Sequence, residues 1–270
     1  MSWQAGDLVE IGRCHDAKTV AAWFEQTEFD AEAVVMSRDG QGSLASLLAR
    51  SRLPSAQEID GLDPQALASL LQPLPHREYS IASIPEDGSL HLLVREVCGP
   101  DGPGIGSAWL CRHAPIGADV ALRVRSNPNF HAPMDGSPLI LIGNGLAALR
   151  AQIKARVANG HRRNWLLFGE RQMSRDFYYC DEIEGWLRSG AIERADFAWS
   201  REQPFRIHVQ QRLREAAAEL IRWVDDGAAI HVCGRQDGMA PGVDRVLRDT
   251  LGAAGVERLR EQGRYRRDVY

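Results

Sequence analysis

The second half of the chain alternates short apolar runs with longer amphipathic stretches, and this pattern restricts the fold more than any other feature of the sequence. The apolar runs cover residues 139–142, 165–168, 195–199 and 229–233. A helix is predicted after each run. The first of these helices ends near residue 157, and the others cover about 178–187, 209–223 and 242–251. Strands that are apolar throughout and separated by helices form parallel sheets covered on both faces. The expected fold class is α/β with a doubly wound parallel sheet, whose ligand binds at the carboxyl ends of the strands.

The first half has a different pattern, rich in strands. Residues 5–11, 77–84, 90–97 and 120–124 are strand-like, whereas residues 17–24, 44–49 and 64–71 are predicted helices. Asp63 and Pro64 suit a helix start, because Asp caps free N–H groups and proline fits the first turn. These patterns indicate a β-rich unit with a helical insert at about residues 12–72. Since the composition changes at residues 133–138, we predict two domains, 1–134 and 135–270.

Composition excludes several classes of function. The chain has 270 residues, a net charge of −4 and a pI near 6.1, so it lacks the basic stripe that nucleic-acid binding needs. Its five cysteines form no close pair and its histidines are scattered, so we predict neither a disulfide framework nor a metal site. The sequence shows no signal peptide and no apolar run of about 18 residues. We therefore expect a cytoplasmic protein without a membrane segment.

Residues 77–80, Arg-Glu-Tyr-Ser, carry the side chains that hold a flavin. The Arg77 guanidinium suits a diphosphate, the Tyr79 ring suits the face of the isoalloxazine, and the Ser80 hydroxyl suits its reactive nitrogen. A second aromatic residue, Tyr270 at the end of the sequence, suits the other face of the flavin. The alternative for residues 77–80 is an ordinary exposed strand, and four residues by themselves do not exclude it.

Two glycine-rich turns precede predicted helices, where free backbone N–H groups favour phosphate. The first turn contains Gly104 and Ser107, for which a flexible surface loop is the alternative. The second contains Gly143 and Gly145 within the pattern G-x-G-x-x-A, after a strand and before a helix, as in dinucleotide-binding loops. By itself this second turn indicates an NAD-dependent dehydrogenase without flavin, which leaves residues 77–80 unexplained.

The loop after the third strand of the parallel sheet is rich in phosphate-binding residue types. Arginine clamps a phosphate monoester through two N–H groups, and a hydroxyl adds a further donor. A solvated charged loop is the alternative. The residues of these types are Ser200, Arg201 and Arg206, and the family resemblance described below adds His208 and Gln210 to the set.

Together these motifs resemble the ferredoxin–NADP⁺ reductase family, in particular the reductase half of diflavin enzymes such as the sulfite reductase flavoprotein. The resemblance is densest from residue 71 to residue 270. It implies a β-barrel-like FAD domain at residues 1–134, an NADP(H)-binding domain at residues 135–270, and FAD and NADPH as cofactors. It places Gly104 and Ser107 at the FAD pyrophosphate.

The same resemblance implies roles for residues of the second domain. Residues 200–210 select NADPH over NADH through its 2′-phosphate, although Arg206 replaces the usual Lys and His208 the usual Tyr. The hydride transfer is assisted by Ser80, Cys233 and Asp268.

The sequence also departs from the family. Two residues of the family's pattern, a Thr-Gly pair that wraps the NADPH pyrophosphate, have no counterpart between Gly145 and Leu146. The first barrel strands and an FMN domain are also expected to be missing. We therefore expect an FAD-dependent oxidoreductase module that passes hydride from NADPH to FAD and electrons to a flavodoxin, an FMN domain or a metal-centre protein. The alternative is a truncated, catalytically impaired flavoprotein remnant that acts as a binding or assembly subunit.

Overall fold

The computed structural model describes residues 2–99 and 102–270 and divides the chain into two compact units. Unit 1 contains Ser80–Leu93, Val124–Tyr270 and the chain up to Leu8. Unit 2 contains Val9–Tyr79 and Val94–Arg123. The chain passes between the units within the strands β1 (Leu8–Ile11), β4 (Arg77–Ser80) and β7 (Leu122–Arg125), and again between Leu93 and Val94.

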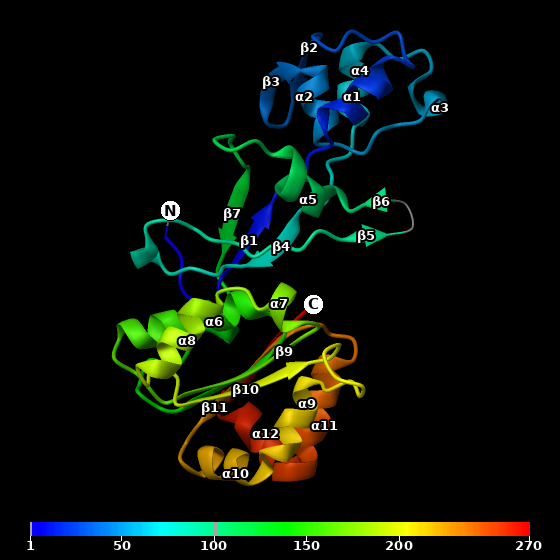
Figure 1. Ribbon diagram of the computed structural model, residues 1–270. Coiled ribbons are helices and arrows are strands. Elements are labelled where there is room, and N and C mark those ends of the chain that lie inside the picture. Colours follow the sequence, from blue (N-terminus) through cyan, green and yellow to red (C-terminus); the bar gives the residue numbers. More distant parts are fainter. Residues whose placement is uncertain (1, 100–101) are drawn as a thin grey trace. The chain divides into compact units, whose positions relative to one another are not determined.

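Unit 1 is built on a five-stranded parallel sheet in the order β10-β9-β8-β11-β12 (Figure 1). The β8 sequence, Leu-Ile-Leu-Ile-Gly, is buried at every position because helices cover both faces of the sheet. The strands are β8 (Leu139–Gly143), β9 (Asn164–Glu170), β10 (Arg194–Trp199), β11 (Ala229–Gly234) and β12 (Tyr265–Val269).

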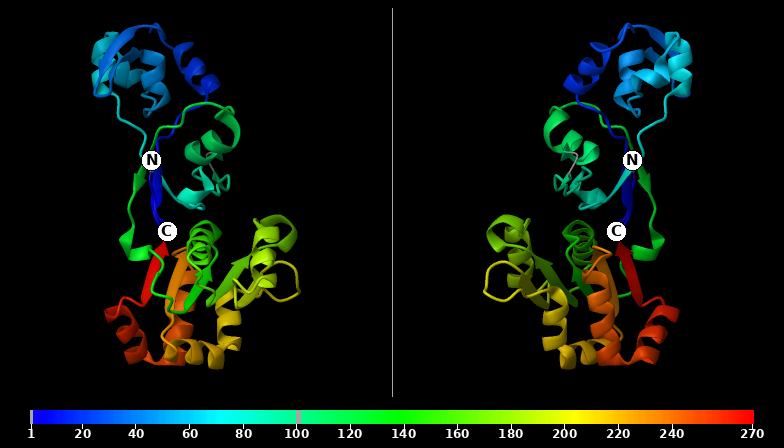
Figure 2. Two further views of the ribbon diagram at one scale, coloured as in Figure 1. Left: turned by 90° about the vertical axis from the view of Figure 1, so that its left-hand side faces the viewer. Right: turned by 90° about the vertical axis from the view of Figure 1, so that its right-hand side faces the viewer.

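Two separate hydrophobic clusters fill the two faces of this sheet. One joins Ile140 and Trp165 of the sheet to α9, α10, α11 and α12, and the other joins Leu141 and Phe168 to α6 and α8. Figure 2 shows the two groups of helices on opposite sides of the strands. The helices are α6 (Leu146–Ala158), α7 (Met173–Asp176), α8 (Cys180–Arg188), α9 (Val209–Glu215), α10 (Ala217–Asp225), α11 (Met239–Leu251) and α12 (Ala253–Glu261), with 3-10 turns at Pro85–Asp87 and Pro128–Phe130.

Unit 2 combines a three-stranded sheet, in the order β4-β1-β7, with a small helical subdomain. The subdomain packs Val35, Leu44, Leu48 and Leu67 into its own core. The strands are β1 (Leu8–Ile11), β4 (Arg77–Ser80), β7 (Leu122–Arg125) and the antiparallel pairs β2 (Val34–Ser37) with β3 (Gly40–Ser43) and β5 (Cys98–Gly99) with β6 (Gly102–Pro103). The helices are α1 (Ala17–Phe24), α2 (Leu44–Ala49), α3 (Ala56–Ile59), α4 (Pro64–Leu70) and α5 (Ile105–Ala108), which continues into a π-helical turn at Trp109–His113.

The doubly wound parallel sheet expected from the sequence is confirmed. The start of α4 is also as predicted, because the Asp63 carboxylate accepts a hydrogen bond from the Ala66 N–H at 2.7 Å. Among the described residues, no helix has the length and apolar character needed to cross a membrane. The β-barrel-like form of the first domain stays a prediction.

Two sequence-based expectations were wrong, and one strand was not foreseen. Residues 90–97 form no strand, since only Leu92 makes an isolated bridge, to Ile81. The helix expected over residues 209–223 divides into α9 and α10 at Ala216, whose φ of −97° and ψ of 23° interrupt it. Strand β12 was not foreseen, because its sequence Tyr-Arg-Arg-Asp-Val alternates too little to mark an edge strand.

Candidate functional site

Three polar side chains from distant parts of the sequence meet in unit 1. The register of the parallel pair β11 and β12 sets Cys233 beside Asp268. The Cys233 thiol lies 3.9 Å from Asp268 Oδ2, and the Ser80 hydroxyl lies 3.5 Å from the same oxygen. The three residues that the resemblance implied for hydride transfer are therefore brought together, and their catalytic role remains a prediction.

The environment of Cys233 keeps its side chain as a neutral thiol. Complete burial raises the pKa of this thiol well above its usual range, and the Asp268 carboxylate raises the pKa further. A thiolate would lie in a low-dielectric site beside a second negative charge, which both physical effects oppose. Cys233 is thus an S–H donor facing a carboxylate, and not a prepared nucleophile.

The turn between β8 and α6 packs directly against the end of β11. The N–H groups of Asn144 and Gly145 each lie 3.2 Å from the Cys233 carbonyl oxygen and donate to it. Gly143 has a φ of +154°, and a Cβ atom there would lie 1.8 Å from the same oxygen, so only glycine fits. A Cβ on Gly145 would lie 2.6 Å from the Cys233 sulfur and 3.2 Å from the Tyr270 hydroxyl. Gly143, Gly145, Cys233 and Tyr270 therefore form one packed group.

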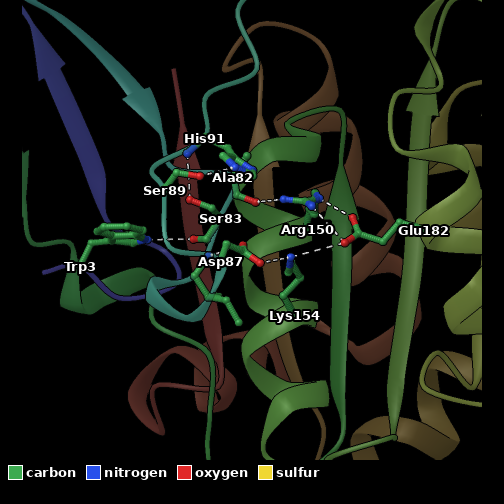
Figure 3. A network of polar contacts seen from close by, with 10 residues as sticks. Trp3, Ala82, Ser83, Asp87, Ser89, His91, Arg150, Lys154 and Glu182 are labelled. Carbon is green, nitrogen blue, oxygen red and sulfur yellow. Dashed lines mark hydrogen bonds and ion pairs between the residues drawn. The ribbon is translucent and has the colours of Figure 1, made fainter. Parts of the chain in front are cut away.

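A polar network holds the segment from Ala82 to His91, which follows Ser80 in the chain (Figure 3). The buried Arg150 of α6 donates to the Ala82 carbonyl oxygen and, with two nitrogens, to the Glu182 carboxylate of α8. Its guanidinium also lies 4.0 Å from the centre of the Tyr179 ring, a cation–π contact. Because a buried cation needs all of these partners, Arg150 ties residues 80–82 to two helices.

Further contacts extend this network toward residue 91, as Figure 3 also shows. Lys154 of α6 pairs with Asp87 at 2.5 Å. The Ser83 hydroxyl accepts from the His91 N–H at 2.9 Å, and the Ser83 carbonyl oxygen accepts from the Trp3 indole at 3.0 Å. The bond from the His91 N–H takes the place of one ladder bond that a strand over residues 90–97 would have made.

The predicted phosphate-binding loop follows β10 in the same unit. Its base is anchored to the end of β9 by the N–H groups of Ser200 and Arg201, which donate to the carbonyl oxygens of residues 170 and 171 at 2.9 Å. Arg201, Arg206 and His208 are exposed, whereas Gln210 packs against Gly242. Among the described residues, no carboxylate lies within 4.0 Å of either arginine's charged group. The loop therefore presents two unneutralised cations to an anion.

Residues 77–79 of the flavin motif lie in unit 2, where Arg13 lies near Arg77. A Cβ atom on Gly106 of α5 would lie 2.8 Å from the side chain of Arg13 and 3.2 Å from that of Arg77. Burial and the charge of Arg77 both lower the pKa of Arg13. Tyr79 is half-buried on the same strand as Arg77, and burial raises its pKa. The two side chains approach the same glycine through their methylene carbons, and the charge of one acts on the other. No ion pair of Arg13 or Arg77 is found among the described residues, so the pair suits a diphosphate.

The turn at residues 104–107 has a structural role of its own. The Ser107 hydroxyl donates to the Gly104 carbonyl oxygen and accepts from the Val97 N–H, both at 3.1 Å. The Gly104 N–H donates to the Val97 carbonyl oxygen at 2.7 Å. These bonds shape the turn in front of α5, and the predicted contact of Gly104 and Ser107 with a pyrophosphate stays a prediction.

Comparison with known proteins agrees with these features, although no protein-family model matches the chain. The sulfite reductase (NADPH) flavoprotein alpha-component of Salmonella paratyphi B is 38% identical over 229 residues, which are 77% of this chain and 38% of that protein. The corresponding proteins of Klebsiella pneumoniae and Escherichia coli O157:H7 are each 37% identical over the same length. This chain is a homologue of these flavoproteins. It spans 38% of the length of the curated relatives named here.

In this sulfite reductase flavoprotein homologue, the resemblance inferred from the motifs is thus confirmed. Two features of the site had escaped sequence reasoning. Arg13 lies 64 positions before Arg77 in the sequence, and no local motif marks it. Asn144 stands between two glycines, yet its side-chain oxygen accepts from the Arg235 N–H at 3.2 Å. Both contacts arise from tertiary packing, which short motifs do not encode.

Proposed function

We propose that this chain is an FAD-dependent oxidoreductase module that takes hydride from NADPH and passes electrons to a flavodoxin-like, FMN-binding or metal-centre protein. The observation that carries the proposal is the pair of arginines, Arg13 and Arg77, that converge on Gly106 without a neutralising carboxylate among the described residues. Cations are rarely held together in this way unless an anion completes the site, because they repel each other.

These residues fit a dinucleotide flavin. The two guanidinium groups match the charge of a diphosphate, and a half-buried Tyr79 on the same strand offers an aromatic face. FAD, when bound, supplies the redox chemistry, since it accepts two electrons together and releases them singly. The relatives are named sulfite reductase (NADPH) flavoproteins, and this name supports the same cofactor pair here.

The chain's own residues would then orient the reactants and hold a proton in place near Asp268. Asp268 accepts from Ser80 and Cys233, so that both donors point to one carboxylate oxygen. The Arg150 network holds the Ser80 segment against α6 and α8, which limits the freedom of its hydroxyl. In this proposal Tyr270 covers one face of the flavin, and Ser200, Arg201, Arg206, His208 and Gln210 bind the 2′-phosphate end of NADPH.

A second function is favoured by the tight turn at Gly143–Gly145. Its amides donate to Cys233 instead of facing outward, which supports a flavoprotein remnant with impaired NADPH oxidation that acts as a binding or assembly subunit. The cytoplasmic location and the division of cofactors between residues 1–134 and 135–270 remain predictions under either function.

The test is reconstitution of the purified chain with FAD, followed by its absorption spectrum and by anaerobic stopped-flow reduction with NADPH. A stoichiometric flavin spectrum with NADPH-dependent bleaching supports the oxidoreductase. A flavin that dithionite bleaches but NADPH does not supports the remnant. The absence of saturable FAD binding at micromolar concentration would refute both.

A further inference from the structure

One pocket of unit 1 contains none of the residues assigned above to the flavin, the nucleotide or hydride transfer. It has a volume of about 270 Å³, and every residue that lines it belongs to unit 1. Most of the lining side chains are apolar, and three of them, Ala5, Ile84 and Ala155, belong to one small hydrophobic cluster. A concave, mainly apolar site with a few polar groups is the usual form of a small-molecule site. The polar groups of this pocket therefore indicate which small molecule it suits.

Trp3 forms an aromatic wall of the pocket. Its indole N–H donates to the Ser83 carbonyl oxygen at 3.0 Å, which holds the ring in place (Figure 3). Because this bond satisfies the polar atom of the indole, the ring is left to make apolar and cation–π contacts, and indole binds cations more strongly than the other aromatic side chains do. Met134 is 47% exposed, lines the same pocket and offers a polarisable sulfur. This wall suits an organic group that carries a positive charge.

Glu86 supplies a negative charge to the pocket. It is exposed and makes no ion pair with another described residue. Asn159 adds a neutral acceptor, because its Nδ2 donates to the Ala155 carbonyl oxygen at 2.8 Å and its Oδ1 has no hydrogen-bond partner in the part of the chain that the structure describes. The pocket also borders the carboxyl end of α6, where backbone carbonyls carry a partial negative charge. These groups favour a ligand that donates hydrogen bonds and is positively charged.

His131 is the other titratable residue among the described residues that line the pocket. Its Nε2 lies 2.6 Å from Asp7 Oδ1. Burial would raise the pKa of Asp7, but its bonds to His131 and to backbone N–H groups lower that pKa overall, so the carboxylate is charged. The pair therefore has no net positive charge in either protonation state of His131. The two cations in the last two turns of α6, Lys154 and Arg156, do not line the pocket.

We propose that this pocket binds a small organic ammonium ion, in which an alkyl or aryl group ends in a protonated amine. The organic group contacts Trp3, Ile84 and Met134, and the ammonium pairs with the exposed Glu86. The inference is independent of the flavin and of NADPH, because no residue proposed to bind either of them lines the pocket. Since pockets for drug-sized ligands begin near 300 Å³, the ligand has about ten non-hydrogen atoms or fewer.

The experiment follows the Trp3 indole N–H signal in a ¹H–¹⁵N NMR titration of the full chain, and the loss of one signal in Trp3→Phe identifies it. Three probes of similar size differ in charge: 2-phenylethylammonium, neutral 2-phenylethanol and anionic 3-phenylpropionate. The ammonium is expected to bind with a dissociation constant on the order of 0.1–1 mM, within the range for so small a ligand. It should bind at least about fivefold more tightly than the alcohol, because the ion pair and the cation–π contact add to the apolar contact. The anion should bind least tightly.

Three exposed positions provide variants that should fold as the original chain does. Glu86→Gln removes the charge and keeps the shape, so the ammonium should weaken by about fivefold and lose its preference over the alcohol. Glu261→Gln removes a carboxylate of α12 that has no ion pair among the described residues, and this matched control should change neither ligand. Ala158→Leu places a larger side chain in the pocket and should weaken the ammonium and the alcohol together. Thermal unfolding checks that each variant is folded.

An alcohol or an anion that binds as tightly as the ammonium would overturn the inference, because the pocket would then be apolar without selectivity for charge. The inference also fails if no probe shifts the Trp3 signal at about 10 mM, ten times the weakest expected dissociation constant. Equal weakening by Glu86→Gln and Glu261→Gln would likewise refute it, since the ammonium would then respond to the net charge of −4 and not to a site. None of these outcomes bears on the proposed flavin chemistry, which reconstitution with FAD tests separately.

Discussion

Cys233 and Asp268 lie side by side in the register of two adjacent parallel strands, with the thiol sulfur 3.9 Å from the carboxylate. Parallel pairing of β11 with β12 enforces this approach, since both residues lie near the carboxyl ends of their strands. The pKa of the thiol is raised first by burial and then by Asp268. The Cys233 thiol therefore acts as the hydrogen-bond donor and the Asp268 carboxylate as the acceptor. Experiments can distinguish this role of Cys233 from that of a nucleophile.

The first prediction is that a hydroxyl can replace the thiol. Cys233→Ser keeps a donor toward Asp268, so flavin reduction by NADPH should stay within about threefold of the original rate. Cys233→Ala removes the donor and should slow reduction by about tenfold or more. Stopped-flow absorbance measures both rates. Equal loss in the two variants would indicate that the sulfur itself reacts.

The second prediction concerns His231, which is fully buried on β11. Its Nδ1 contacts the Gln152 side-chain oxygen at 2.8 Å, and its Nε2 has no hydrogen-bond partner in the described structure. Burial, with Arg266 and Arg156 nearby, lowers its pKa from 6.5 to about 3. Between pH 6.5 and about pH 3, His231 is protonated in the unfolded chain but neutral in the folded chain. The neutral His231 therefore does not reduce the free energy of unfolding above pH 6.5. As the pH falls from 6.5 toward 3, the free energy of unfolding decreases, because the unfolded chain gains the proton.

This loss should reach about 1.4 kcal/mol per pH unit well below pH 6.5. Urea unfolding at pH 6.5, 5.5 and 4.5, followed by the fluorescence of the buried Trp165 and Trp223, measures the slope. His231→Leu should lower the slope by that amount, whatever it does to stability at pH 7. Parallel slopes in the two proteins would contradict the assignment.

The third prediction is that Arg150 stabilises the segment around Ser80. Arg150→Ala leaves the Glu182 carboxylate and the Ala82 carbonyl without this partner, at a cost of about 3 kcal/mol. For a unit of this size, that lowers the Tm by roughly 6–12 °C. Hydrogen exchange of residues 82–91 should accelerate. The control is Arg188→Ala, an exposed partner of Glu184 on α8, which should change the Tm by less than about 2 °C. Similar losses in the two variants would refute the special role of Arg150.

The sequence was sufficient for the parallel sheet because runs such as residues 139–142 are apolar on both faces. The sequence did not predict the structure correctly where polar side chains replace the backbone hydrogen bonds between strands. Residues 90–97 look like a strand, yet the Ser83 hydroxyl takes the His91 N–H and leaves only one bridge. Conversely, β12 is a strand at the edge of the sheet, where charged residues are tolerated. Its sequence, Tyr-Arg-Arg-Asp-Val, therefore lacks the apolar pattern that would have predicted a strand.

The candidate site shows the same division. Ser80, Cys233 and Asp268 were foreseen together only through a family resemblance, because no local pattern links positions so far apart. The turn at Gly143–Gly145 is held by a contact with Cys233, some 90 residues later, whose carbonyl oxygen accepts from two N–H groups of the turn at 3.2 Å. The absence of the Thr-Gly pair after Gly145 can be recognised in the sequence. The direction in which the amides of the remaining turn point depends on tertiary packing and cannot.

The last prediction separates the two arginines of unit 2 from the rest of the flavin site. Arg13→Ala and Arg77→Ala should each raise the dissociation constant of FAD by about tenfold, because each removes a charged partner of the diphosphate worth about 1.4 kcal/mol. Riboflavin has no phosphate, so its weaker binding should be unchanged. Arg38→Ala, an exposed arginine of the same unit between β2 and β3, is the matched control and should affect neither ligand.

Without FAD, Arg77→Ala should leave the Tm unchanged or raise it, whereas Arg13→Ala also removes a hydrogen bond to the Pro75 carbonyl oxygen. Burial and the charge of Arg77 both lower the pKa of Arg13, so the two charges repel each other in the flavin-free chain. Removing one charge relieves this repulsion, as expected where binding residues are held at a cost to stability. Fluorescence titration and thermal unfolding of the flavin-free chain provide the two measurements. Equal losses of FAD and riboflavin binding, or a clear fall in the Tm of the flavin-free Arg77→Ala chain, would mean that the arginines stabilise the unit and do not bind the diphosphate.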